Sequence, residues 1–176
     1  MFIEIEDLKE EPLHVKHVYG AGEIRLDHED AALIKPVAVD FVLMHKERDL
    51  RVDGRIETAI GFKCSRCVRE SILPLSATYD LFYLPQPEWK SDNAEIELRY
   101  EEMEVGFYDG ARFDVDLMIL EQIELAIPMK LLCREECRGL CYFCGADLNE
   151  GPCACNKQET DSRLAVLLDF RKKMDK

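Results

Sequence analysis

Cysteine is the residue type in this chain with the clearest chemical meaning, and it occurs eight times. Two of the cysteines form the motif Cys64-Ser65-Arg66-Cys67, and the other six lie close together further along the chain. A closed zinc site takes four thiolates in a tetrahedron, and two thiolates spaced Cys-x-x-Cys can bind one ion from a single tight turn. The chain therefore carries enough ligands for two structural sites of four cysteines each, and we predict one or two zinc ions as its cofactor.

The order of the cysteines suggests how they divide between two sites. Gly145 directly follows the second Cys-x-x-Cys motif and can take the positive φ that a tight turn around a metal needs. The expected sets are Cys64, Cys67, Cys133 and Cys137, and Cys141, Cys144, Cys153 and Cys155. A second division also fits the spacing: Cys133 or Cys137 joins the later cysteines and leaves the upstream pair apart.

Other uses of these thiols remain open at this point. Iron–sulfur clusters are held by the same ligands. A redox dithiol at Cys64 and Cys67 is a further alternative, but such a pair is expected to open a helix in a βαβ unit, and this stretch is rich in β-formers. Four thiolates on one zinc ion leave no open coordination position, so we expect a structural role, no catalytic residues and no enzyme activity.

Strands are the main elements expected to hold these cysteines in place. Residues 50–60 alternate apolar and polar side chains with period two, which is typical of a half-buried strand. Pro74 indicates an edge strand or a bulge. The predicted strands cover residues 37–44, 50–60, 71–84, 96–100 and 103–107.

A helix is predicted over residues 114–127. Asp114 is a candidate N-cap, apolar residues recur at helical spacing after it, and Pro128 ends the pattern. A last helix is expected to begin near Asp161 or Ser162. The predicted fold class is α+β, a mainly antiparallel, sheet- or barrel-like domain with one packing helix. Its expected parts are a β-rich core at residues 1–128, a cysteine-rich metal-binding segment at 129–157 and a C-terminal helix at 158–176.

The net charge of −13 argues against a protein that binds bare nucleic acid over a wide surface. The charge is uneven, since residues 95–124 are rich in acids while residues 46–69 are rich in bases. We predict that the metal sites gather basic residues into one partner-binding patch. Its members are Lys63, Arg66, Arg69, Lys130, Arg134 and Arg138.

Targeting signals are not apparent in the sequence. The start of the chain alternates apolar and acidic residues and lacks the basic and apolar regions of a signal peptide. No stretch approaches the roughly 20 apolar residues of a membrane span. We therefore expect a cytoplasmic protein with no membrane partner, in a compartment where thiols stay reduced.

The segment Leu132-Cys133-Arg134-Glu135-Glu136-Cys137-Arg138-Gly139-Leu140-Cys141-Tyr142-Phe143-Cys144-Gly145, followed by Cys153-Ala154-Cys155, resembles the YceD family of large ribosomal RNA subunit accumulation proteins. The upstream Cys-x-x-Cys and the helix ending at Pro128 extend this resemblance over nearly the whole chain. The resemblance implies a non-enzymatic factor that supports accumulation of large-subunit (23S) ribosomal RNA. It also implies that the set containing Cys64 is the shared feature and that the set containing Cys141 is an optional second one.

Three functions follow from these observations, in descending order. The first is a ribosome-assembly factor that contacts a large-subunit precursor through a basic ribosomal protein, rRNA or both. The second is a zinc-stabilised adaptor between unrelated proteins. The third is an iron–sulfur or redox protein, which visible absorbance would distinguish.

Overall fold

A computed structural model describes residues 1–8, 11–47, 49–86 and 105–155. Its main element is a six-stranded sheet in the order β2-β4-β5-β6-β7, in which β3 also pairs with β5. The strands are β2 (Leu13–Tyr19), β3 (Ala31–Leu33), β4 (Val37–Lys46), β5 (Asp49–Lys63), β6 (Glu70–Pro85) and β7 (Val105–Tyr108). All pairs are antiparallel except β6 with β7. A second sheet pairs β1 (Phe2–Glu4) with β8 (Arg112–Asp114), and a 3-10 turn, η1 (Ile5–Asp7), follows β1.

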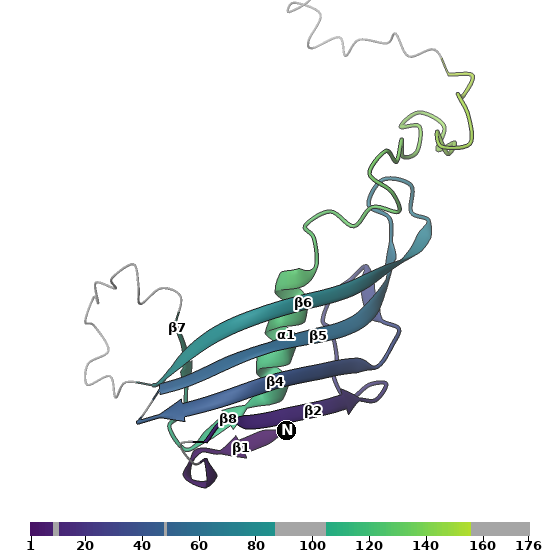
Figure 1. The fold of residues 1–176 in the computed structure, drawn as a ribbon. Helices are drawn as coiled ribbons and strands as arrows, with labels where there is room; N and C mark the ends of the chain where they lie inside the picture. The colour runs from purple at the N-terminus through teal and green to yellow at the C-terminus, as the bar shows by residue number, and fades with distance from the viewer. Residues whose placement is uncertain (9–10, 48, 87–104, 156–176) are drawn as a thin grey trace, which may run out of the picture.

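Period-two alternation places the core on one face of the large sheet. Along β5, Leu50, Val52, Ile56 and Ile60 are fully buried, whereas Arg51, Asp53, Arg55 and Glu57 are exposed. The helix α1 (Val115–Ala126) lies across the buried face (Figure 1). It covers that face with Val115, Met118, Ile119 and Ile123.

The limits of α1 follow from local chemistry. Asp114 is the N-cap, and its side chain accepts a hydrogen bond of 3.2 Å from the backbone N–H of Leu117. The helix ends at Ala126, two residues before Pro128, because the residue that precedes a proline is disfavoured in the α region. This helix therefore confirms the prediction for residues 114–127.

The hairpin of β5 and β6 extends beyond β4, and only β3 pairs with β5 near the closed end, as far as Phe62. These two strands pair from Leu50 with Tyr83 as far as Lys63 with Glu70, and the Cys64–Cys67 turn closes the hairpin. The segment after α1, residues 127–155, continues past this end of the sheet (Figure 1). Residues far apart in the sequence therefore meet at the closed end of one hairpin.

The structure confirms the α+β fold class, with an open sheet. The predicted strands at 37–44, 50–60 and 71–84 correspond to β4, β5 and β6, and each is longer than predicted. The strand expected at 103–107 corresponds to β7, as far as the described residues reach. β1, β2, β3 and β8 were not predicted, and the strand at 96–100 and the C-terminal helix at 158–176 lie outside the described residues.

Candidate metal centres

The two Cys-x-x-Cys motifs form the same backbone turn. In the first turn, the N–H of Val68 donates to the carbonyl of Cys64 at 2.8 Å, and the N–H of Cys64 donates to Arg69 at 2.9 Å. In the second, the N–H of Gly145 donates to Cys141 and the N–H of Cys141 donates to Ala146, both at 2.8 Å. The two turns have the same backbone hydrogen bonds, so each places its two cysteine sulfurs where they can bind one metal ion.

The eight thiols gather into two groups. The first cluster is Cys64, Cys67, Cys133 and Cys137, and the second cluster is Cys141, Cys144, Cys153 and Cys155. Within each cluster all four Sγ atoms lie within 4.8 Å of one another. This is the first of the two divisions that the sequence allowed.

The spacing of the sulfurs suits a tetrahedral ion. In the first cluster the Sγ atoms of Cys64 and Cys137 are 3.8 Å apart and those of Cys67 and Cys133 are 3.7 Å apart. In the second cluster Cys141 and Cys153 are separated by 3.4 Å. Four sulfurs at about 2.3 Å from zinc have edges of about 3.8 Å. All eight cysteines are free, at distances well beyond the roughly 2.05 Å of a disulfide.

Acid–base chemistry shows what the first cluster requires. Burial acts to raise the pKa of Cys64, but three backbone N–H groups, among them that of Cys133, point at its sulfur and lower the pKa to about 6. Burial and the neighbouring sulfurs raise the pKa of Cys133 to about 12. Ionisation of one thiol thus hinders ionisation of the next, and a bound cation would stabilise all four thiolates together.

The second cluster repeats this behaviour nearer to solvent. Backbone N–H groups of Cys144 and Phe143 lower the pKa of Cys141 to about 6. Hydrogen bonding with Cys144 and burial raise the pKa of Cys155 to about 12. Cys141 is buried and Cys144 is exposed, whereas three of the four thiols in the first cluster are buried. Both clusters fit a divalent metal ion, and the first is better shielded from water.

Asn149 connects the two clusters, and sequence reasoning missed it. It lies in the second cluster's loop, yet its Nδ2 donates to the Sγ of Cys137 in the first cluster at 3.5 Å. Its Oδ1 accepts from Arg134 Nη2 at 2.9 Å and from the backbone N–H of Arg138 at 2.8 Å. Such contacts orient metal ligands. A lone asparagine between ligand motifs gives no signal in a sequence, because the contact depends on how the loops pack.

Backbone contacts join residues 127–155 to the hairpin end. Ser65 N–H donates to Leu131 at 2.8 Å, and Leu140 N–H donates to Arg66 at 3.1 Å. Gly139 has a φ of +74°, and a Cβ there would lie 3.0 Å from the carbonyl oxygen of Arg66. A side chain at this position would therefore be strained and would press the two segments apart.

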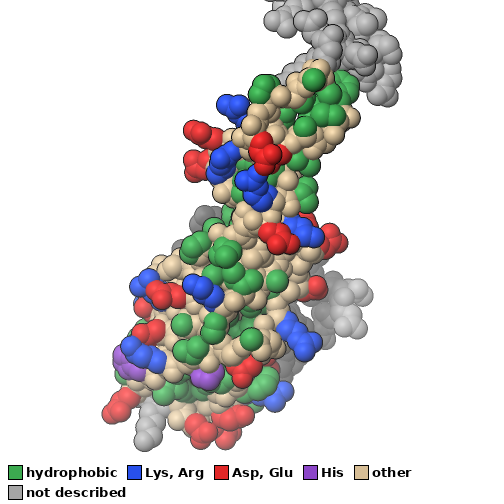
Figure 2. All heavy atoms as spheres, turned by 90° about the vertical axis from the view of Figure 1, so that its right-hand side faces the viewer, with side chains coloured by type: hydrophobic (Ala, Val, Ile, Leu, Met, Phe, Trp, Pro, Cys, Tyr) green, Lys and Arg blue, Asp and Glu red, His purple; other side chains and the backbone are tan. Residues whose placement is uncertain are grey.

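The six predicted partner-binding residues divide into two groups. Arg66 Nη1 donates to the carbonyl of Cys137 at 2.7 Å, Arg69 Nη2 contacts Asp147 at 2.9 Å and Glu150 at 3.3 Å, and Arg134 binds Asn149. Lys63, Lys130 and Arg138 are exposed, and their side chains have no polar partner among the described residues. Figure 2 shows basic and acidic side chains interspersed on this part of the surface.

This arrangement revises the expectation of one free basic patch. Three of the arginines hold the cysteine loops together, so their cationic groups are already engaged. A role in partner binding stays a prediction for all six residues, and it is strongest for Lys63, Lys130 and Arg138. The sequence could not show this for Arg69, because Asp147 and Glu150 reach it only after the segment that carries the second cluster folds back onto the hairpin.

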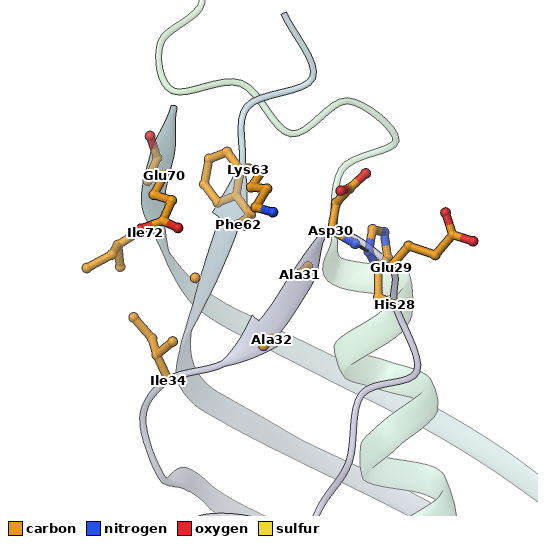
Figure 3. A pocket seen from close by; sticks show the side chains of 12 residues that line it. His28, Glu29, Asp30, Ala31, Ala32, Ile34, Phe62, Lys63, Glu70 and Ile72 are labelled. Carbon is orange, nitrogen blue, oxygen red and sulfur yellow. Dashed lines mark hydrogen bonds between the residues drawn. The ribbon is translucent and has the colours of Figure 1, made fainter. Parts of the chain in front are cut away.

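A hollow of about 610 Å³ lies beside the same end of the sheet. Its wall is apolar where Ile34 and Ile72 flank Gly61, and both isoleucines are exposed. His28, Glu29 and Asp30 lie on one side of the hollow and Glu70 on the other (Figure 3). His28 Nδ1 accepts the backbone N–H of Asp30 at 3.1 Å, so this nitrogen is already engaged.

In the part of the chain that the structure describes, no helix is long and apolar enough to cross a membrane. No solved structure matches the chain.

Several known proteins are similar in sequence. A protein of Arabidopsis thaliana named "Large ribosomal RNA subunit accumulation protein YCED homolog 1, chloroplastic" is 26% identical over 159 residues, which cover 79% of this chain and 50% of that protein. A protein of the same name from Zea mays is 26% identical and covers 74% of this chain and 52% of its own length. An uncharacterised protein of Mycobacterium bovis is 31% identical over 122 residues, covering 68% of this chain and 54% of its own.

The chain thus spans about half the length of the curated relatives it matches. A family model described as "Large ribosomal RNA subunit accumulation protein YceD" matches residues 52–171. This match includes the hairpin end, α1 and all eight cysteines. The chain therefore belongs to the YceD family.

Proposed function

We propose that this protein is a non-enzymatic factor that supports accumulation of large-subunit ribosomal RNA and assembly of the large ribosomal subunit. The observation that carries the proposal is the pair of four-cysteine clusters at the hairpin end, inside the region that matches the family model. Closed sites of this kind stabilise a surface and leave no position open for substrate. The names of the plant relatives support the same reading.

Zinc is the proposed ion in both clusters. Thiolate sulfur is a soft ligand that zinc accepts in tetrahedral structural sites. The ligands themselves also suit iron, so the metal requires a direct measurement. Purification without added metal, followed by elemental analysis, is expected to give zinc and no visible absorbance. A brown protein with iron and sulfide would replace zinc by an iron–sulfur cluster.

The proposed partner is a precursor of the large subunit, contacted through a basic ribosomal protein with local contact to rRNA. Lys63, Lys130 and Arg138 are free to meet phosphate, since their side chains have no polar partner among the described residues. Three cations are few against a net charge of −13, so a wide contact with rRNA is disfavoured. A basic protein is the better match for most of the surface. The proposed location is the cytoplasm.

Depletion of the protein tests this function. We expect sucrose gradients of depleted cells to show loss of large subunits and of mature large-subunit rRNA. The tagged protein should sediment with precursor particles, and this association should weaken with salt because phosphate contacts are salt-labile. A normal rRNA profile, with the protein at the top of the gradient, would contradict the proposal and favour a general zinc-stabilised adaptor.

Complementation with variants refines the test. The triple variant Lys63→Glu, Lys130→Glu and Arg138→Glu should sediment less with precursors while it keeps its zinc. A matched control reverses three exposed basic residues away from the clusters, Arg25, Lys35 and Lys46. If both variants lose association equally, overall charge is responsible and the cysteine loops are not the contact.

A further inference from the structure

The outer side of α1 combines exposed apolar and acidic side chains. Opposite the buried residues of the helix lie Leu117, Glu121, Glu124 and Leu125, which we call the acid–apolar stripe. The spacing of Leu117, Glu121 and Leu125 by four residues places them in one row along the helix. Leu117 is 52% exposed and Leu125 is 78% exposed, so the stripe offers apolar surface next to its two carboxylates.

A groove lies at each end of this stripe. At the start of α1 a groove of about 370 Å³ is bounded by Phe2, Phe107 and Leu117, and the rings of Tyr83 and Phe113 meet edge to face beside it at 4.9 Å. At the end of α1 a groove of about 440 Å³ is lined by apolar residues that include Ile127, Met129 and Leu131. The first groove reaches along α1 to Glu121 and the second begins at Glu124, so the two grooves together follow most of this 12-residue helix.

Both grooves have acidic rims. The first contains Asp109, Asp114 and Glu121, and the second contains Asp27, Asp30 and Glu124. The first groove also has Arg112, but its guanidinium contacts Asp109 at 3.5 Å and lies over the ring of Phe2. The surface as a whole is therefore negatively charged.

Neither Glu121 nor Glu124 has an ion pair among the described residues. Burial and the charge of Glu124 raise the pKa of the Glu121 carboxyl, so a cation close to this pair would be stabilising. An anionic ligand would meet repulsion along the whole stripe.

We propose that the acid–apolar stripe and its two grooves bind a basic, amphipathic segment of a protein partner. Apolar anchors of the segment enter the grooves beside Phe107 and Met129, and its lysines and arginines meet Glu121, Glu124 and the acidic rims. The acidic side chains disfavour RNA phosphate along α1 itself, whereas the exposed Lys130 lies at the far end of the second groove, between Met129 and Leu131. The inference rests on the proposed function, since it names the chemical class of the ribosomal partner and assigns it a surface along α1 that reaches the Cys64–Cys67 turn at Ser65.

Binding of a labelled peptide tests the proposal. The probe is a synthetic peptide of about 15 residues that spaces leucines four residues apart among lysines and arginines, as the stripe requires. Fluorescence anisotropy with the full-length, zinc-loaded protein should show saturable binding. The double variant Glu121→Lys and Glu124→Lys should weaken it by at least about tenfold. Leu125→Ser with Met129→Ser should also weaken it, and both side chains are exposed enough for the fold to tolerate the change.

Matched controls separate the stripe from general charge. Asp53→Lys with Glu57→Lys makes the same change of charge on the exposed face of β5 and should leave binding unchanged. Val18→Ser removes an exposed apolar side chain on β2 and should also be silent. Equal weakening by the stripe and control variants would overturn the proposal. Two other results would also overturn it. If the protein self-associates and Leu125→Ser abolishes this, the stripe binds a second copy of the chain; if a single-stranded RNA binds and needs Leu125, the stripe binds RNA.

The test is separable from that of the proposed function. If the stripe variants bind the peptide poorly but still sediment with precursors and restore rRNA, the inference is wrong and the function stands. If the peptide binds as expected while depletion leaves rRNA unchanged, the surface is real and the ribosomal function is wrong.

Discussion

Val68 and Gly145 occupy the same place in two equivalent turns, but their side chains differ. Both follow the second cysteine of a Cys-x-x-Cys motif, and both have positive φ, +60° for Val68 and +73° for Gly145. Glycine tolerates this conformation, whereas a β-branched residue is strained by roughly 1–2 kcal/mol. Val68 is 60% exposed, so burial of its side chain offsets little of this backbone strain. The first turn therefore holds strain that the second avoids.

We expect Val68→Gly to stabilise the zinc-loaded protein by about 1 kcal/mol, after the greater freedom of glycine in the unfolded chain is subtracted. The reciprocal change Gly145→Val should destabilise the second turn by about the same amount. A Cβ at Gly145 meets no atom within 4 Å, so no clash of this Cβ adds to the backbone strain. Urea unfolding at saturating zinc measures both. If Val68→Gly destabilises the protein, the contacts of the valine side chain contribute more to stability than the backbone strain removes.

Among the structural elements, the hairpin end and the two cysteine loops form one unit. The hairpin supplies Cys64 and Cys67, the loop after α1 supplies Cys133 and Cys137, and Asn149 reaches back from the second loop. Arg69 makes a parallel link from the hairpin to Asp147. Binding of a metal ion to the second cluster is thus expected to keep Asn149 in place and, through it, the ligand Cys137 of the first cluster.

Asn149→Ala should speed the release of zinc from the first cluster, because Cys137 loses its hydrogen-bond donor. An effect of about tenfold is typical of such outer-shell contacts. Zinc release to a chromogenic chelator is measured with both clusters filled, and the phase of release that Cys67→Ser removes is assigned to the first cluster. Asn149→Asp keeps the Oδ1 acceptor for Arg134 but not the Nδ2 donor, so it too should release zinc faster. Release at the rate of the unchanged protein would show that Asn149 only shapes the loop.

In the molecule as a whole, the two clusters have unequal shares in the fold. Cys64, Cys67 and Cys137 belong to the hydrophobic core that runs through the sheet and α1. Cys144 is exposed, and the second cluster lies further along the chain, outside that core. The first cluster should therefore determine global stability and the second the shape of the outer loops.

Cys67→Ser and Cys144→Ser are a matched pair for this difference. Each should lower the zinc content from two ions to one, measured by native mass spectrometry. Cys67→Ser should lower Tm by at least about 10 °C, because structural zinc contributes folding energy and 1 kcal/mol shifts Tm by roughly 2–4 °C at this size. Cys144→Ser should lower Tm by less than half as much as Cys67→Ser. Equal shifts in Tm would show that both clusters stabilise the core alike.

Local patterns in the chain were enough to predict its chemistry and its main elements. Period-two alternation identified β5 because one face of that strand is buried and the other is exposed, and Asp114 and Pro128 marked the limits of α1. Cysteine spacing identified the ligand type, and the resemblance to the YceD family was carried by residues in one continuous segment. The short strands β1, β3 and β8 were missed because three residues are too few to show a period.

Two features, in contrast, depend on how distant segments pack: how the eight cysteines divide between the two clusters, and which basic side chains already have a partner within the protein. Sequence spacing left two divisions open, and the fold selects one by bringing residues 133–137 onto the end of the β5–β6 hairpin. Arg66 and Arg69 were predicted to be free cations, yet their partners lie about 70 to 80 residues away. The same holds for Asn149, because hydrogen bonds and ion pairs between distant segments depend on loop packing that no local pattern records.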